Sequence, residues 1–287
     1  MRLVVATACL ASGHTKGVST TVSLVELVAP LRADPAHTAI LLDVDGTLAP
    51  IITEAGDVAL ADSTRDYLQA VAKKYRLVAC VSGRRAAEAK RIVAIGELAY
   101  IGNHGIERLD RDSWDLQLSD EIGLWGQRVQ EFTASQQSRD LERLGVRFED
   151  KAVITALHWR GAADEEAAQA AVSAIADSAQ DAGLATHWGR KVLEIRPPLN
   201  FDKGSAIEDL LRDSDVYNAL YAGDDSTDLD AFAALTRMAD SAQLRTAVRV
   251  GVRSQEGPAL IAEASDFFLQ SQQEIDLLLS ALIGREE

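Results

Sequence analysis

Short apolar runs alternate with amphipathic stretches along the chain from Thr38 onward. The segment 63–75 repeats its apolar side chains every three or four residues, which is the spacing of a helix with one buried face. We expect Ser63 to cap the start of this helix. Further helices are expected over 85–95, 204–213, 227–236 and near 272–283. The strand-like apolar runs are 39–44, 76–81, 98–101, 218–223 and 248–252. Strands that alternate with helices in this way predict an α/β fold with a doubly wound parallel sheet.

The middle of the chain has a different pattern. A long amphipathic helix is expected over 119–143 and an alanine-rich helix over 163–182, with strand-like runs at 146–149, 152–159, 184–187 and 192–195. We therefore expect a smaller α/β cap domain at 108–196, inserted into a core made of 37–107 and 197–287. Pro197-Pro198 breaks the chain and is the expected hinge between the two. Residues 1–36 show no motif, and this N-terminal extension has no assigned role.

Composition narrows the class of protein. The 287 residues are 47% hydrophobic and 25% charged, which is ordinary for a globular protein with a real core. A formal charge of −15 argues against a nucleic acid or an anionic membrane as partner, because both select basic surfaces. Two cysteines, Cys9 and Cys80, do not suggest a disulfide framework or a zinc site, and Cys80 lies in an apolar run typical of a buried thiol. We expect a monomeric cytoplasmic enzyme.

Polar side chains follow four of the expected strands. They are Asp43 and Asp45, Ser82, Asn103 and His104, and Asp224 and Asp225. Ligands gather at the carboxyl ends of strands in an open parallel sheet, so these residues are expected to lie together. The D-x-D spacing puts both of the first carboxylates on one side of an extended segment, and Gly46 lets the chain turn after them. So many carboxylates need a cation, and oxygen ligands alone favour Mg²⁺.

A weaker interpretation exists for each short segment. Alone, D-x-D-G-T at 43–47 is compatible with a fragment of a calcium loop or with a polar turn. An EF-hand needs further oxygen ligands, and the next four residues, LAPI, offer none. Ser82, D-K-G at 202–204 and G-D-D at 223–225 each lie at the boundary of an expected element. The combination favours a functional site over a polar turn.

These segments resemble a known superfamily. LLDVDGT at 41–47, VSGR at 81–84, DKG at 202–204 and GDDSTD at 223–228 are similar to the four motifs of the haloacid-dehalogenase (HAD) phosphotransferases. The resemblance runs from about residue 38 to the C-terminus and implies a HAD-like, Rossmann-type core. It implies that Asp43 is the nucleophile and forms an aspartyl-phosphate, and that Asp45 protonates the leaving oxygen and later activates water.

The same resemblance implies the remaining roles in the core. Ser82 and Lys203 would hold the phosphoryl oxygens. Mg²⁺ would bind the Asp43 carboxylate, the Asp45 backbone carbonyl and Asp224. Asp225 and Asp228 would orient Lys203 or the waters of the metal. Each role suits the chemistry, because a carboxylate that attacks a phosphate dianion needs positive charge, and a two-step hydrolysis needs one group that is first an acid and then a base.

The inserted segment resembles the trehalose-6-phosphate phosphatases within that superfamily. EDK at 149–151, HWR at 158–160, GRKVLEIRP at 189–197 and NHGIE at 103–107 are similar to signatures of that family. By this resemblance the substrate-binding residues are Val44, Asn103, His104, Glu149, Lys151, Arg160, Arg190 and Glu194. Glu149, Lys151 and Glu194 would hydrogen-bond the sugar hydroxyls. Arg190 stands where the family usually has lysine, which keeps the charge but changes the hydrogen-bonding geometry.

Structural roles compete with these in the inserted segment. Glu149 and Lys151 alternate along a strand and would also suit a solvated face. His158 is better explained as a satisfied core histidine than as a catalytic group, and Trp159 as packing rather than sugar stacking.

The expected activity is the Mg²⁺-dependent hydrolysis of trehalose 6-phosphate in trehalose biosynthesis. A phosphatase for sucrose phosphate or mannosyl-phosphoglycerate would share every core residue. Phosphomannomutase also carries D-x-D-G-T but should lack the GRKVLE segment. An inactive regulatory module, such as the phosphatase-like part of a trehalose-phosphate synthase, typically loses the nucleophile or a metal ligand. Because Asp43, Asp45, Lys203 and Asp224 are all present, we favour an enzyme acting on a small sugar phosphate.

Overall fold

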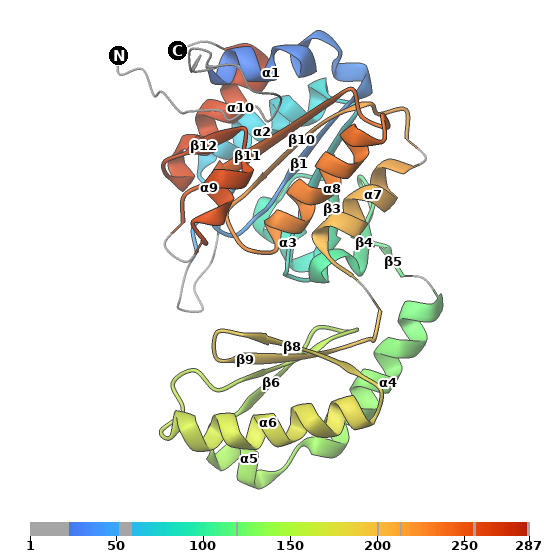
Figure 1. Ribbon diagram of the computed structural model, residues 1–287, viewed down its shortest axis with the longest axis vertical. Coiled ribbons are helices and arrows are strands. Elements are labelled where there is room, and N and C mark those ends of the chain that lie inside the picture. The colour runs from blue at the N-terminus through green and yellow to red at the C-terminus, as the bar shows by residue number, and fades with distance from the viewer. Residues whose placement is uncertain are drawn as a thin grey trace, which may run out of the picture. The chain divides into compact units, whose positions relative to one another are not determined.

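The chain forms two compact units (Figure 1). The structure is a computed structural model that describes residues 23–51, 59–118, 120–199, 201–212, 214–254 and 257–285. The first unit, the core, combines Met1–Leu116 with Phe201–Glu287, and the second, the cap, is Gln117–Asn200. The sequence predicts that the insertion begins at residue 108, whereas β4 (Glu107–Leu109) and β5 (Leu116–Gln117) still belong to the core sheet.

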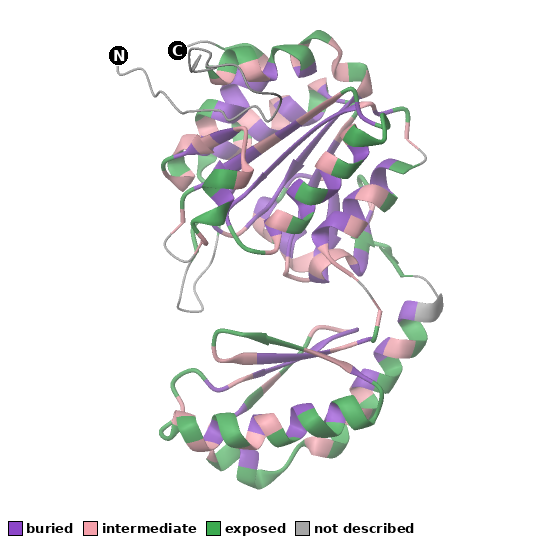
Figure 2. Cartoon of the chain, viewed as in Figure 1, coloured by how far each residue is buried: buried purple, intermediate pink, exposed green. Residues whose placement is uncertain are grey.

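The core contains an eight-stranded sheet. Its strand order is β12-β11-β10-β1-β2-β3-β4-β5, and the strands from β12 to β3 are parallel. β4 runs antiparallel to β3. Their bounds are β1 Thr38–Leu42, β2 Leu77–Val81, β3 Ala99–Gly102, β4 Glu107–Leu109, β5 Leu116–Gln117, β10 Asn218–Gly223, β11 Thr246–Val252 and β12 Phe267–Leu269. The central strands are buried along their length (Figure 2), as expected for a parallel sheet covered on both faces.

Helices cover both faces of this sheet. Along β1, Ile40 and Leu42 face one hydrophobic cluster, and Ala39 and Leu41 face the other. The first cluster includes α1 (Leu24–Ala33), α2 (Asp62–Lys74), α3 (Ala86–Val93) and α10 (Ile275–Ile283). The second includes α7 (Lys203–Arg212), α8 (Asp228–Asp240) and α9 (Leu260–Ala264). The alternation of side chains along each strand therefore produces the doubly wound, three-layered core that the sequence predicts.

The cap has its own core. Its antiparallel sheet has the order β6-β7-β9-β8, with β6 Arg147–Asp150, β7 Thr155–His158, β8 Ala185–Gly189 and β9 Val192–Arg196. The helices are α4 (Asp120–Gln136), α5 (Arg139–Arg143) and α6 (Glu165–Asp181). Leu157 and Leu193 pack with Val129 of α4 and Val172 of α6 in one hydrophobic cluster. One face of the cap sheet is thus buried under helices, and the opposite face carries the alternate residues of each strand.

Two local predictions are wrong. The expected single helix over 119–143 is broken between α4 and α5, where Ser138 caps α5 by accepting a hydrogen bond from the Leu141 amide at 3.4 Å. The N-cap of α2 is Ala61 and not Ser63. The Ser63 hydroxyl instead donates to Asp276 of α10 at 2.7 Å, because α2 and α10 lie in the same layer.

The extension before residue 37 is part of the core where the structure describes it. Val28 and Leu31 of α1 are fully buried, and Ser23 and Glu26 form a capping box at its start. Residues 1–22, with Cys9, lie outside the described residues. Cys80 is a buried free thiol, as predicted. No helix in the described ranges combines the length and apolar character needed to cross a membrane.

Candidate active site

The candidate site lies where the connections of the core sheet change direction. β1 and β10 are neighbours, but the chain continues from β1 to β2 on one side and from β10 to β11 on the other. Ligands bind at such switch points, beyond the carboxyl ends of the strands. Asp43 directly follows β1 and Asp224 directly follows β10. The Asp43 amide still donates to Ala222 O at 2.9 Å, so both carboxylates leave the sheet at the same level.

Lys203 is the cation at the centre of this site. Its Nζ donates to Asp43 Oδ1 and to Asp228 Oδ1, both at 2.6 Å, and all three residues are buried. Burial alone would lower the pKa of Lys203, but the charges of Asp228 and Asp43 outweigh it and raise the pKa. Lys203 is the first residue of α7, so the D-K-G segment places this charge at the helix start, facing the strand ends.

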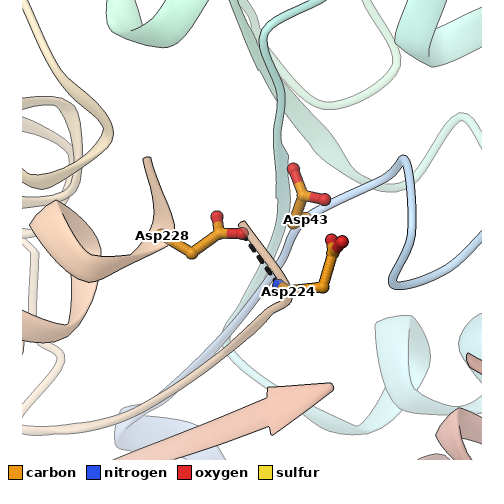
Figure 3. A group of neighbouring side chains, drawn as sticks. All are labelled: Asp43, Asp224 and Asp228. Atoms are coloured by element: carbon orange, nitrogen blue, oxygen red, sulfur yellow. Dashed lines mark hydrogen bonds between the residues drawn. The ribbon is translucent and has the colours of Figure 1, made fainter. Parts of the chain in front are cut away.

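Asp228 accepts hydrogen bonds through both of its carboxylate oxygens. Its Oδ1 accepts from Lys203 and from the Tyr221 hydroxyl, each at 2.6 Å. Its Oδ2 accepts from the Asp224 amide at 2.9 Å (Figure 3) and from the Asp225 amide, also at 2.9 Å. Both oxygens are thus engaged in holding Lys203 and the turn after β10. The orienting role expected for Asp228 stays a prediction.

Three carboxylates gather around this one ammonium group. Ligand oxygens of Asp43, Asp224 and Asp228 lie within 4.8 Å of one another (Figure 3). Burial and the neighbouring carboxylates raise the pKa of Asp43 well above its usual value. The pKa of Asp224 rises to about 6, chiefly through burial. Three carboxylates against one ammonium group leave an excess of negative charge, and the ligand atoms on offer are all oxygens. Both features fit a divalent cation such as Mg²⁺. Asp43 and Asp224 would hold it, because the oxygens of Asp228 are already engaged.

Gly46 makes room for Asp224. Its φ of +88° is a left-handed conformation, and a Cβ built there would lie 2.2 Å from Asp224 Oδ2. The Thr47 hydroxyl donates to Asp224 Oδ1 at 3.2 Å from the same turn. The G-T of the first motif therefore brings the two strand ends together, which only glycine allows at position 46.

The segment after β1 turns earlier than expected. The strand ends at Leu42 and Val44 lies in a turn, so Asp43 and Asp45 have different partners. Asp45 is half-buried, and Arg84 binds both of its oxygens, with Nε to Oδ2 at 2.6 Å and Nη2 to Oδ1 at 2.8 Å. The Val44 side chain is fully buried in the core, so only its backbone is available to a substrate.

Ser82 lies beside this pair at the end of β2. It is 1% exposed, and its hydroxyl oxygen accepts from the Arg84 amide at 3.1 Å. Asn103 is buried, and the ring of His104 lies against Gly83, where a Cβ would come within 2.8 Å of it. The Asp225 side chain does not contact Lys203, one of the groups that it was expected to orient. Its exposed carboxylate accepts from the Ser226 amide at 2.6 Å, and its backbone amide donates to Asp228.

A second set of charged side chains lies on the face of the cap sheet that is opposite the helices, here called the open face. Glu194 accepts from Lys151 Nζ at 3.0 Å through Oε1 and from Arg196 Nε at 2.9 Å through Oε2. Glu149 lies on the same face. Glu149 of β6 and Glu194 of β9 are both directly opposite Ala156 of β7, the strand between them, and residues opposite one another point to the same side of a sheet. His158 Nε2 lies 2.7 Å from Glu149 Oε2. Hydrogen bonding by His158, followed by smaller charge effects, lowers the pKa of Glu149 despite its partial burial.

Four expectations for the cap have different outcomes. The prediction of a core histidine is wrong, since His158 is half-buried on the open face and bonds to Glu149. Trp159 is packing, as predicted, with 3% exposure in the cap core. Arg160 and Arg190 are exposed in turns next to His158 and Gly189, at the opposite end of the strands from Lys151. The structure does not bring these two arginines to Lys151.

Sequence reasoning missed Arg84 and Arg196 as partners of site carboxylates. Both lie inside recognised segments, VSGR and GRKVLEIRP, so an unassigned arginine in a motif was the available signal. Tyr221 and Thr47 were missed as hydrogen-bond donors to Asp228 and Asp224. Tyr221 and Thr47 lie close to the motif carboxylates in sequence, but both are uncharged, so their residue type alone does not indicate a role at the site.

Comparisons with known proteins agree with this geometry. A family model described as trehalose-phosphatase matches residues 41–273. Trehalose 6-phosphate phosphatase RA3 of Zea mays is 33% identical over 220 residues, which cover 69% of this chain and 59% of that protein. A trehalose-phosphate phosphatase of Mycobacterium avium (strain 104) is 34% identical over 210 residues, covering 69% and 51%. The chain thus spans little more than half the length of these relatives.

Solved structures share the fold. The C-terminal domain of a Candida albicans trehalose-6-phosphate phosphatase aligns with a TM-score of 0.69 at 19% identity, covering 98% of this chain and 99% of that one. A haloacid dehalogenase-like hydrolase of Bacteroides thetaiotaomicron aligns with a TM-score of 0.60 at 12% identity, covering 85% and 98%. The fold is therefore HAD-like. Because the family match runs from β1 through the whole cap and back to the last strand, the chain belongs to the trehalose-phosphatase family.

Proposed function

We propose that this chain hydrolyses trehalose 6-phosphate to trehalose and phosphate, with Mg²⁺ and through an aspartyl-phosphate on Asp43. The observation that carries the proposal is the buried contact from Lys203 to Asp43 inside a carboxylate cluster at the switch point. Family membership supports the substrate class. An inactive module is disfavoured, because Asp43, Asp45, Lys203 and Asp224 are all present at the candidate site.

In the first step a carboxylate oxygen of Asp43 attacks phosphorus, and the bond from phosphorus to the sugar oxygen breaks. Asp45 gives a proton to the departing sugar oxygen. Lys203 and the Ser82 hydroxyl stabilise the negative charge on the remaining phosphoryl oxygens.

In the second step water attacks the phosphorus of the aspartyl-phosphate, and its bond to Asp43 breaks. Asp45, now a carboxylate, takes the proton from that water, so that phosphate and the starting enzyme result. Asp43, Asp224 and the Asp45 backbone carbonyl would hold a divalent ion, which would neutralise negative charge on the nucleophile and the phosphate. Asp228 keeps Lys203 charged and directed at the Asp43 oxygen.

Recognition of the sugar is assigned to the open face of the cap sheet. Glu149, Lys151 and Glu194 offer charged acceptors and donors to a ligand rich in hydroxyl groups, and such hydrogen bonds are the strong ones. Arg196 and His158 hold Glu194 and Glu149 in place. We expect Asn103, His104 and the Val44 backbone to contribute from the core, and we assign Arg160 and Arg190 a supporting role.

Phosphate release from a panel of sugar phosphates, with Mg²⁺ and with EDTA, tests the proposal. The panel contains trehalose 6-phosphate, sucrose 6-phosphate, mannosyl-phosphoglycerate and para-nitrophenyl phosphate. The proposal predicts Mg²⁺-dependent release with the highest kcat/KM for trehalose 6-phosphate. A preference for another sugar would overturn the substrate assignment alone, and no release from any ester would favour the regulatory module. A monomeric state and a cytoplasmic location stay predictions.

A further inference from the structure

Glu107 is a buried carboxylate to which the proposed chemistry assigns no role. It is 1% exposed and begins β4, opposite Gly102 at the end of β3. Burial raises its pKa, and the Ala86 amide and Arg85 offset part of that shift. A carboxylate in this position is costly unless it is hydrogen-bonded. The groups that bond to it therefore indicate what it does.

Glu107 joins two segments that border the candidate site. Its Oε2 accepts from the Ala86 amide at 2.8 Å, which is the first N–H of α3. Its Oε1 accepts from Asn103 Nδ2 at 2.9 Å, and Arg85 Nε lies 3.5 Å away. One side chain thus fixes the start of α3 and the turn after β3 at the same time.

That turn is an unfavourable conformation that needs such support. Asn103 and His104 have φ values of +48° and +58°, and two successive residues other than glycine in this region are uncommon. The Asn103 amide donates to Arg84 O at 2.7 Å and the His104 amide to Ser82 O at 3.1 Å. The turn is therefore bonded, residue by residue, to the loop that carries Ser82 and Arg84.

We propose that Glu107 is a positioning residue that holds the loop 82–85 and the turn 103–104 as one unit. Through this unit it fixes Ser82 toward the phosphoryl group and Arg84 on Asp45. Neither role requires Glu107 to touch the substrate. The inference rests on the proposed function, because Ser82 and Asp45 have their roles only in phosphoryl transfer.

The test is a double-mutant cycle on the full chain. Glu107→Gln keeps the size of the side chain but leaves one good acceptor where two donors need to be satisfied. Asp266→Asn is the control, because Asp266 is a partly buried carboxylate next to β12 that accepts hydrogen bonds from Arg249 of β11, away from the candidate site. Each change is made in the wild-type, Ser82→Ala and Arg84→Lys backgrounds. The measurements are kcat and KM for trehalose 6-phosphate and para-nitrophenyl phosphate, below the unfolding temperature.

We expect Glu107→Gln to lower kcat about 10- to 100-fold for both esters, with little change in KM. In at least one of the two mutant backgrounds the loss should shrink to less than about threefold, because coupled residues are not additive. Asp266→Asn should affect only the unfolding temperature. An unchanged kcat for Glu107→Gln, or the same full loss in both backgrounds, would overturn the proposal.

If Glu107→Gln does not fold, Glu107→Asp keeps the charge but shortens the side chain by one methylene group, so that it no longer spans the Ala86 amide and Asn103 together. It is judged by the same criteria. Wild-type activity on the sugar phosphates is measured first. An inactive wild type would contradict the proposed function, whereas an active wild type with an unaffected Glu107→Gln contradicts only the role of Glu107.

Discussion

Arg84 binds Asp45 with two hydrogen bonds, from Nε at 2.6 Å and from Nη2 at 2.8 Å. The planar guanidinium matches the carboxylate, and this paired geometry is one that lysine cannot reproduce. Arg84 also donates from Nη1 to Glu88 in the first turn of α3, which holds the other side of the guanidinium. Asp45, the proton donor of the proposed mechanism, is therefore oriented by Arg84, a motif residue that takes part in no bond-making step itself.

Arg84→Lys should lower kcat/KM about tenfold or more for every phosphate ester, because Asp45 loses its fixed orientation. Arg237→Lys is the control, since Arg237 binds Glu208 through Nε and Nη2 on the exposed surface of α8. The measurement is kcat/KM for trehalose 6-phosphate and para-nitrophenyl phosphate. Equal, small effects of the two substitutions would show that Asp45 works without this clamp.

Metal binding should be visible without any turnover. Mg²⁺ should raise the unfolding temperature of the wild type, because a ligand that binds only the folded state stabilises it and the cluster of Asp43 and Asp224 has excess negative charge. Asp224→Asn should lose most of this gain. Asp225→Asn should keep it, since the Asp225 carboxylate is exposed and bonded to Ser226. A shift that survives in Asp224→Asn would place the metal elsewhere.

Activity should disappear in EDTA and return with Mg²⁺, whereas Ca²⁺ should inhibit. The larger shell and longer bonds of Ca²⁺ would displace the Asp43 carboxylate from the phosphorus. Phosphate release after thorough dialysis measures this directly. Full activity in EDTA would contradict a metal-dependent mechanism.

The cap residues should matter for the sugar and not for the phosphate. Glu194→Gln should cost about 1.5–3 kcal/mol in kcat/KM for trehalose 6-phosphate, the value of a charge-assisted hydrogen bond, and little for para-nitrophenyl phosphate. Asp150→Asn is the control, because Asp150 lies on the helix side of the same sheet and bonds to Gln130. Equal losses on both esters would make Glu194 a structural residue.

The core and its strand ends could be predicted from the sequence because each signal there is local. Apolar runs of strand length determine the sheet, and parallel strands bring their carboxyl ends to one edge. Asp43 and Asp224 are 181 positions apart, yet both simply follow a buried strand. The same logic locates Lys203 at a helix start.

The remaining parts depend on tertiary contacts. Pro30 lies inside α1 and has no N–H for a helical hydrogen bond, so the local pattern argues against that helix. Burial of Val28 and Leu31 against the core outweighs this. Likewise, the bond from Lys151 to Glu194 depends on the order β6-β7-β9, which neither segment reveals alone. Ser63 does not cap α2, because its hydroxyl donates a hydrogen bond to Asp276 of α10.

Covalent catalysis by Asp43 is the central claim, and trapping the intermediate tests it most directly. Asp45→Asn should still allow attack on a reactive ester such as para-nitrophenyl phosphate but should slow hydrolysis of the intermediate, because no base activates water. The enzyme is mixed with this ester and Mg²⁺, quenched in acid within seconds, digested and analysed by mass spectrometry. We predict one phosphoryl group on the peptide that contains residue 43, and none when Asp43 is replaced by Asn. Phosphate release by Asp43→Asn at more than about a thousandth of the wild-type kcat, with no phosphoryl group on that peptide in any variant, would contradict the mechanism.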